Sequence, residues 1–454
     1  MTKDMTKGPV FTTLVTFTIP LVLGNLLQLT YNAIDSMIVG RFVGRNALAA
    51  VGTSNPLMTL ILLFTNGICL GAGILVSFHY GAKQYDILQR QVSTGMISGI
   101  IFSALVALGV TAAARPILML LQVQDEILDE SVMYLRTIMM GLVFSFVYNY
   151  LASMLRSMGD SKSPLYFLGA SAILNIFGDL LFVIVFGLGT FGAGLSTVVC
   201  EGLAAVLCWF YTVRKIQILR LGRKWLIFDK SQFQKICSYG IVSALQQSTV
   251  QMGKIATQGI VNTLGVAVTA AFNATNRMDD YACIPEQNIA HAMTSVMAQN
   301  VGARKNKRVS LTFRYGMILE VCFGFLAAFV FFFAAHPIMA FFTDDEEVIA
   351  EGVRNLRLIA FMYPLPGITN GLQGYFRGIG DLKITLVSSI INMGVRAGSL
   401  AVMVFGFGFG FEAVPFAYLS GWLVMIAFEL PYLIRCLRTH ANRFEQNADS
   451  GGND

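Results

Sequence analysis

The sequence Leu155-Arg-Ser-Met-Gly-Asp160 returns as Phe376-Arg-Gly-Ile-Gly-Asp381, and the two copies lie 221 residues apart. The same offset relates residues along most of the chain: Gly44 and Asn55 to Gly265 and Asn276, Gly81-Ala82 to Gly302-Ala303, Pro116 to Pro337, and Leu135-Arg136 to Leu356-Arg357. A constant offset through helices and loops indicates two copies of one structural unit. In membrane proteins such repeats commonly enclose a path for a solute. The repeat therefore favours a transporter.

The composition indicates that the chain lies in a lipid bilayer. Hydrophobic residues make up 55% of the sequence and charged residues only 13%. The apolar residues form segments of about 20 residues or more, long enough to cross a bilayer. The sequence predicts an all-α protein with twelve membrane spans, at 12–36, 48–80, 92–114, 132–155, 164–187, 192–213, 236–262, 269–300, 315–335, 354–376, 384–405 and 413–434.

Basic residues cluster in alternate loops and acidic residues in the opposite loops, which predicts that both termini are cytoplasmic. The net charge of +6 is thus a signal of topology, and nucleic-acid binding is not needed to explain it. Six spans per repeat place the two halves in the membrane in the same orientation. We expect an N-terminal lobe at 1–213, a basic cytoplasmic linker at 214–235, a C-terminal lobe at 236–434 and a cytoplasmic tail at 435–454.

The sequence carries no signature of an enzyme or of a bound cofactor. The seven cysteines show no CxxC spacing, the four histidines do not cluster, and no phosphate loop or nucleophile elbow appears. No set of residues combines a nucleophile with a base. Without a nucleotide-binding motif, we expect transport to be driven by an ion gradient.

Several polar residues interrupt the apolar spans. An Asp at the centre of a span costs about 2.5–3.5 kcal/mol, so each one needs a reason. Asp35 shares a helical face with Gln28 and Asn32, with Tyr31 beside it, and Asp179 follows Asn175 by one helical turn. Asp35 could instead cap a helix end or pair with Arg41 at the water interface. Asp179 has no neighbouring cation in sequence.

The motifs around these residues resemble one family. Tyr31-Asn-Ala-Ile-Asp35, Leu174-Asn-Ile-Phe-Gly-Asp179, Ala298-Gln-Asn-Val-Gly302 and the repeated Arg-x-x-Gly-Asp loops are similar to those of multidrug and toxic compound extrusion (MATE) transporters. The resemblance covers nearly the whole chain. It implies two six-helix bundles in a V shape and antiport of amphiphilic, cationic compounds against protons or sodium. It also implies a site for the coupling ion, a proton or sodium, at Asp35, Asn175, Asp179 and Thr197.

The C-terminal half departs from one branch of the family, in which acidic residues in the seventh and tenth spans carry coupling. Here Gln246, Gln247 and Asn370 occupy those regions, which places the expected ion site in the N-terminal half alone. In the eighth span Arg277 and Asp280 are expected to pair. We expect a substrate cavity, and the candidate residues that line it are Gln28, Tyr31, Asn32, Glu286 and Arg396. Glu201 either joins the N-terminal site or faces a cytoplasmic cavity.

A flippase for a lipid-linked precursor is the alternative function. It would need a basic cavity for a pyrophosphate, and Lys254, Arg277 and Arg396 are the cations that favour it. The two N-terminal acids favour the antiporter. The expected partners are a small amphiphilic substrate and membrane lipid, with no nucleic acid. We expect a multi-pass monomer in the plasma membrane.

Overall fold

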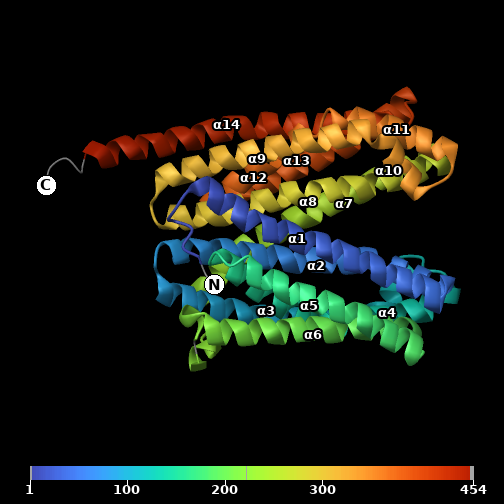
Figure 1. Ribbon diagram of the computed structural model, residues 1–454, viewed down its shortest axis with the longest axis horizontal. Helices are drawn as coiled ribbons and strands as arrows, with labels where there is room; N and C mark the ends of the chain where they lie inside the picture. The colour runs from blue at the N-terminus through green and yellow to red at the C-terminus, as the bar shows by residue number, and fades with distance from the viewer. Residues whose placement is uncertain (1–2, 221, 450–454) are drawn as a thin grey trace. The chain divides into compact units, whose positions relative to one another are not determined.

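The computed structural model describes residues 3–220 and 222–449, which form fourteen α-helices and no strand (Figure 1). The first half contains α1 (Val10–Ile38), α2 (Arg45–Gly81), α3 (Tyr85–Leu120), α4 (Asp125–Ser157), α5 (Lys162–Asp179) and α6 (Gly189–Lys215). The second half contains α7 (Lys230–Val261), α8 (Val266–Gly302), α9 (Asn306–Phe333), α10 (Ala335–Phe342), α11 (Glu346–Ala360), α12 (Pro364–Ile379), α13 (Leu382–Ala401) and α14 (Ala413–Asp449). Short 3-10 or π turns lie at some of the junctions between them.

Eleven of the twelve predicted spans each fall mainly on one helix, whereas α10 was not predicted as a separate helix. The all-α membrane architecture is confirmed. Nine helices among the described residues are long and apolar enough to cross a membrane by length and composition. Polar residues lower the mean hydropathy of α7 and α8, where Gln246, Lys254 and Glu286 lie. The predicted tenth span is divided into α11 and α12, because the chain turns at 361–363, just before Pro364. α14 continues to Asp449 and includes most of the predicted tail, whose residues 450–454 lie outside the described residues.

Unusual backbone conformations recur at the same offset as the sequence. Eight of the twelve positive φ angles form four pairs at this offset: Gly44 (119°) and Gly265 (107°), Lys83 (57°) and Arg304 (55°), Gly159 (85°) and Gly380 (89°), and Gly187 (64°) and Gly408 (70°). A π-helical turn follows α5 at Leu180–Val185 and follows α13 at Val402–Gly406. Residues rarely adopt such angles unless a turn requires them. The two halves therefore repeat one backbone, including its turns.

The described residues divide into two compact units. One contains residues 3–4 and 16–244, and the other contains residues 5–15 and 245–449. The division thus passes through α1 and α7. In the first unit α4 packs against α2, α3 and α6, and in the second unit α8 packs against α9, α11 and α12.

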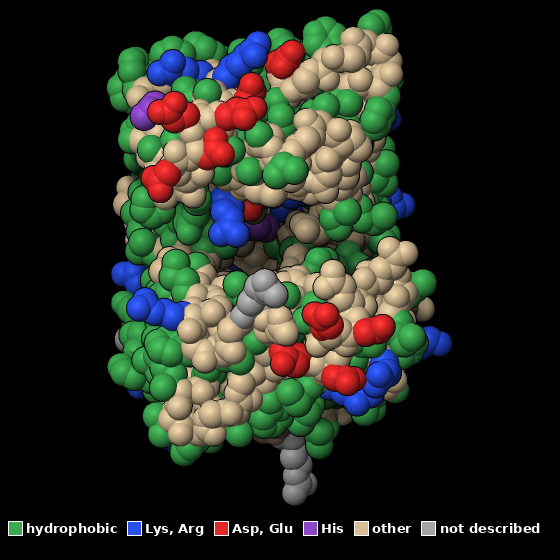
Figure 2. Space-filling model, turned by 90° about the vertical axis from the view of Figure 1, so that its right-hand side faces the viewer, with side chains coloured by type: hydrophobic (Ala, Val, Ile, Leu, Met, Phe, Trp, Pro, Cys, Tyr) green, Lys and Arg blue, Asp and Glu red, His purple; other side chains and the backbone are tan. Residues whose placement is uncertain are grey.

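The acidic loops of the sequence begin two of these helices. Asp125 and Glu126 lie in the first turn of α4, Glu346 and Glu347 in the first turn of α11, and all four are exposed. Carboxylates at a helix start interact favourably with the helix dipole. Figure 2 shows a face of the molecule on which acidic side chains are frequent.

The loop between α4 and α5 is held by the buried side chain of Asp160. Its carboxylate accepts hydrogen bonds from the backbone N–H of Ser163 (3.0 Å), the Ser163 hydroxyl (2.7 Å) and the Tyr211 hydroxyl (3.0 Å). Burial alone would raise the pKa of Asp160, but favourable interactions with its carboxylate, the hydrogen bonds from Ser163 first among them, outweigh burial and hold this pKa below its ordinary value.

We predict that Gly159→Ala destabilises the protein by more than about 1 kcal/mol. Gly159 has a φ of 85°, and a Cβ there would lie 2.1 Å from the carbonyl oxygen of Lys3. The control is Gly109→Ala in α3, where nothing lies within 4 Å and alanine favours the helix. The midpoint of thermal unfolding of each purified variant in detergent measures the change in stability. Equal midpoints for the two variants would contradict the prediction.

We predict that the α4–α5 loop weakens as the pH falls below about 4. The folded-state pKa of Asp160 is depressed, so its stabilisation is present above the unfolded pKa and is lost as the pH falls through the folded pKa. Hydrogen–deuterium exchange of the start of α5 at pH 7 and pH 3 measures the effect. Asp160→Asn should exchange faster than the wild type at pH 7 and show a smaller change with pH. An unchanged rate in this variant would refute the role of the carboxylate.

Candidate ion-coupling site

The predicted ion-site residues come from three helices of the first unit. Asp35 lies three residues before the end of α1, Asn175 and Asp179 lie in the last turns of α5, and Thr197 lies in α6. α5 packs along α6, and the π turn that follows α1 contacts α6 as well. An apolar cluster around Ile38, Val183 and Ala193 surrounds this region.

Asn175 is tied to α6 through Ser196. The Asn175 side-chain amide donates to the Ser196 hydroxyl (3.2 Å), and that hydroxyl donates to the backbone carbonyl of Asn175 (3.1 Å). The neighbouring Thr197 hydroxyl instead donates to the Ala193 carbonyl in its own helix (3.2 Å). The contact that joins the two helices is thus made by Ser196, one position before the predicted Thr197. Sequence reasoning did not single out Ser196.

Asp35 and Asp179 are close enough for their carboxyl groups to interact electrostatically. Asp179 has no exposed surface and Asp35 is half-buried. Neither oxygen of Asp179, nor Oδ1 of Asp35, has a hydrogen-bond partner among the described residues. Two ionised carboxylates are both acceptors and repel each other, and desolvation adds to the cost. A proton or a cation placed between them removes the repulsion.

Two further groups lie in the field of this pair. Tyr134 of α4 is 4% exposed and interacts electrostatically with Asp35, Asp179 and Glu201. Glu201 of α6 accepts a hydrogen bond from the Ser145 hydroxyl (3.3 Å). Glu201 therefore belongs to the surroundings of the acid pair. Only a tertiary contact identifies Tyr134, because no motif in the sequence connects it to the two acids.

The predicted cavity residues of α1 differ in exposure. Gln28 and Asn32 are exposed, whereas Tyr31 is half-buried and interacts with Gln28, Asp35 and Glu201. Tyr31 thus links the exposed face of α1 to the acid pair.

The predicted cavity residues of the second unit are buried and have defined neighbours. Arg396 is 6% exposed, and its guanidinium lies 3.0 Å from the centre of the Tyr418 ring. Glu286 has no exposed surface, and its Oε2 accepts a hydrogen bond from the Asn370 amide (3.5 Å). The stacking on Tyr418 is a cation–π contact.

The expected pair of Arg277 with Asp280 is not the one that forms. The Asp280 carboxylate pairs with Lys254 of α7 (Nζ–Oδ1 2.6 Å), and Arg277 is exposed. Helical spacing brings Arg277 and Asp280 within reach, but the packing of α7 against α8 offers a cation that spacing within one helix does not reveal.

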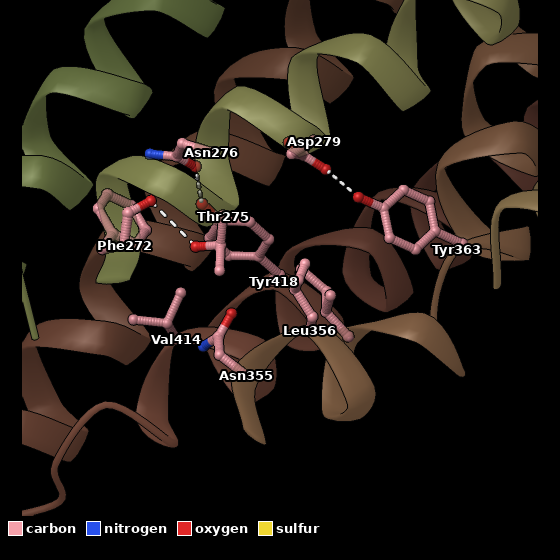
Figure 3. A pocket seen from close by; sticks show the side chains of 10 residues that line it. Phe272, Thr275, Asn276, Asp279, Asn355, Leu356, Tyr363, Val414 and Tyr418 are labelled. Carbon is pink, nitrogen blue, oxygen red and sulfur yellow. Dashed lines mark hydrogen bonds between the residues drawn. The ribbon is translucent and has the colours of Figure 1, made fainter. Parts of the chain in front are cut away.

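A small pocket lined by both apolar and polar side chains lies beside these residues in the second unit (Figure 3). Figure 3 shows Asp279 pointing toward Tyr363, whose hydroxyl donates to the carboxylate (2.7 Å). The Tyr418 hydroxyl donates to the side-chain oxygen of Asn276 (3.4 Å). The pocket joins α8 to the turn before α12 and to α14.

Comparison with known proteins decides the family. The MatE family profile matches residues 20–181 and again residues 243–403, once in each half. The chain belongs to the MATE family. This confirms the family predicted from the motifs, and the MATE fold is that of a multi-pass membrane transporter.

Relatives and solved structures agree with this MATE assignment. The chain is 29% identical over 399 residues to "Probable multidrug resistance protein YpnP" of Bacillus subtilis (strain 168), covering 86% of this chain and 88% of the relative. It is 23% identical over 427 residues to "Probable multidrug resistance protein NorM" of Thermotoga maritima, covering 91% and 88%. A solved structure described as "Crystal structure of MATE in complex with MaL6" has the same fold, with a TM-score of 0.91 at 20% identity, covering 97% of this chain and 100% of that one.

We predict that Tyr363→Phe destabilises the second unit by about 1–3 kcal/mol, because the substitution removes the buried donor to Asp279. The comparison is Asp280→Asn, which breaks the half-exposed pair with Lys254 and should cost less than about 1 kcal/mol. Thermal unfolding in detergent at two salt concentrations measures both, and only the Asp280 effect should shrink with salt. A larger loss in Asp280→Asn than in Tyr363→Phe would contradict the assignment.

Proposed function

We propose that this MATE transporter exports amphiphilic, cationic compounds in exchange for protons or sodium ions. The names of its relatives support the export of drugs or toxic compounds. The observation that carries the coupling is the Asp35–Asp179 pair, in which both oxygens of Asp179 and Oδ1 of Asp35 are buried without a hydrogen-bond partner among the described residues. Such a pair requires a bound proton or cation for at least part of the transport cycle.

The coupling ion acts on helix packing. With the pair empty, the two carboxylates repel each other across the contact between α1 and α5. With an ion bound, the two helices are drawn together. If these packings differ in access to the substrate, the ion gradient biases the equilibrium between them. One charge crossing 100 mV supplies about 2.3 kcal/mol, which shifts such an equilibrium by roughly fiftyfold.

We place the first substrate contacts on the face of α1 that carries Gln28, Tyr31 and Asn32. This face ends at Asp35, so a bound cation there would compete for the same negative charge. Glu286 and Arg396 are buried in the second unit, and in our proposal they contact substrate only when helices move.

We further propose a monomer in the plasma membrane, with both termini cytoplasmic, and transport that needs no cofactor and includes no enzymatic step. The flippase alternative has no specific support. Of the cations it would use for a pyrophosphate, Lys254 is paired with Asp280 and Arg396 lies against Tyr418.

We predict that Asp35→Asn and Asp179→Asn each abolish ion-driven export and leave substrate binding measurable. Asparagine keeps the size of the side chain but neither takes up a proton nor changes its charge. Asp381→Asn, in the loop before α13, should retain export. Purified variants in liposomes with an imposed proton or sodium gradient give both readouts. The wild type in the same liposomes identifies the ion, since substrate should drive movement of only one of them.

Full gradient-driven export by Asp35→Asn would place the coupling site elsewhere. Transport without movement of either ion would remove the antiport proposal and favour the flippase.

A further inference from the structure

The chain between α6 and α7 is folded onto the first unit. Residues 216–220 and 222–228, here called the α6–α7 segment, contain two short 3-10 turns, at Gln217–Leu219 and Gly222–Leu226. Ile216 and Leu219 are buried in an apolar cluster that also contains residues of α3. The segment therefore has an inner face that is packed against the protein.

Two hydroxyl groups of α3 fix the end of this segment. The Ser93 hydroxyl lies 2.8 Å from the Trp225 carbonyl oxygen and 2.7 Å from that of Ile227, and it donates its proton to them. The neighbouring Thr94 hydroxyl accepts a hydrogen bond from the backbone N–H of Asp229 (2.9 Å). The end of the segment is thus held at a defined height along α3.

Three consecutive apolar side chains at this end are exposed. The exposed fractions are 80% for Leu226, 39% for Ile227 and 52% for Phe228, and we call these three residues the apolar tip. Trp225, the residue before the tip, instead packs against Trp209 of α6, with ring centroids 4.7 Å apart. Apolar surface in water is unfavourable in proportion to its area. An apolar tip that hydrogen bonds hold outward therefore indicates an apolar partner.

The apolar tip lies at the level where α3 becomes apolar. α3 begins at Tyr85 and is long and apolar enough to cross a membrane. Its last charged residue before Arg115 is Arg90, and Ser93 follows three residues later. At a rise of 1.5 Å per residue, Ser93 lies about 12 Å from the start of α3. The tip is therefore level with the boundary between lipid headgroups and hydrocarbon.

The chain around the apolar tip carries an excess of positive charge. Residues 214–235 contain seven lysines and arginines and one acid, Asp229. Asp229 accepts a hydrogen bond from the backbone N–H of Ser231 (2.9 Å) and pairs with Arg90 (3.8 Å). Asp86, exposed in the first turn of α3, is a further acid of this region. Two acids do not balance these cations, so the surface has a place for an anion.

The two turns of the segment meet at Gln89 of α3. The Gln89 amide donates to the Ile218 carbonyl (2.8 Å), and its oxygen accepts from Lys224 (3.5 Å). Arg220, two residues after Ile218, donates through Nε to the Arg214 carbonyl at the end of α6 (3.1 Å). Arg220 and Lys224 are both exposed. The segment thus presents two cations beside its apolar tip.

We propose that the α6–α7 segment is a membrane-surface anchor that binds an anionic lipid. Arg220 and Lys224 contact the headgroup phosphate, and the apolar tip enters the layer of acyl chains below it. The phosphate supplies the negative charge that the segment lacks, and the acyl chains cover the tip. A zwitterionic headgroup carries its own cation and compensates the two side chains less well. The anchor uses contacts within the first unit and does not depend on the proposed antiport.

The test uses the full chain in lipid vesicles and the fluorescence of Trp225. The chain has three tryptophans, so Trp209→Phe with Trp422→Phe leaves Trp225 alone. Bromine atoms on the acyl chains quench a tryptophan that lies beside them. Quenching measured against the mole fraction of brominated lipid gives the binding constant of phosphatidylglycerol relative to that of phosphatidylcholine. This ratio should exceed one by roughly tenfold.

Two pairs of substitutions separate the cations from the apolar tip. Arg220→Gln with Lys224→Gln should lower the ratio roughly tenfold, to near one, because both lipids then meet the same apolar tip. Leu226→Ser with Phe228→Ser should reduce quenching by both lipids and leave their ratio unchanged, because the cations remain.

The matched control is Lys307→Gln with Arg314→Gln, two exposed cations of α9. This pair removes the same net charge and should leave the ratio unchanged. Inorganic phosphate added to the wild-type segment at the concentration of the lipid phosphate should not lower the ratio. A ratio near one without any substitution in the segment, an equal fall in the control pair, or a loss of the ratio with phosphate would each overturn the anchor.

A second measurement covers the case in which the tryptophan substitutions prevent folding. Native mass spectrometry of the chain with all three tryptophans counts the phosphatidylglycerol molecules that stay bound in detergent. The Arg220 and Lys224 pair should retain fewer of them than the wild type, and the control pair should retain as many. Equal retention by all three proteins would overturn the anchor. The outcome is separate from that of the antiport, because Asp35 and Asp179 are intact and no transport is measured.

Discussion

The hydrocarbon interior offers no water to the backbone, so each spanning segment must satisfy its own amide and carbonyl groups within a helix. The rest of this structure follows from that condition. Several helices end where glycine or a positive φ angle permits a turn, and some of these positions, such as Gly44 and Gly265, recur in both halves. The order of the helices recurs as well, although α9 with α10 in the second half corresponds to α3, and α11 with α12 corresponds to α4. The repeat is therefore a property of the backbone, and side chains are free to differ between the halves.

The hydrocarbon interior also makes every buried charge costly. The two halves place their buried charges at different positions. The first half places Asp35 and Asp179 near the ends of α1 and α5. The second half has no acid pair there, and its buried acids Glu320 and Glu429 lie in α9 and α14. A common scaffold thus carries two unlike sets of protonatable groups.

The packing in the second unit determines whether its cations are available to a ligand. In isolation, Lys254 and Arg396 suggest a basic cavity, but each is committed to a neighbour. Lys254 pairs with Asp280 across two helices, and Arg396 lies on the face of Tyr418. Both contacts lower the positive potential that an anionic ligand would meet. The net charge of the chain therefore reflects its loops more than its interior.

Composition, the fixed offset and the hydrophobic segments determined the membrane class and the helical architecture, since these depend on local periodicity and on the solvent. The family was indicated by a resemblance of short motifs. The acids of the N-terminal site were also evident, because a charge inside an apolar span stands out without any structure. Only the tertiary structure decided which side chains these polar residues contact. Ser196 rather than Thr197 bonds Asn175, Tyr134 joins the acid pair, and Asp280 pairs with Lys254 rather than Arg277. Spacing along one helix says which residues share a face, but the neighbouring helix determines which partner is there.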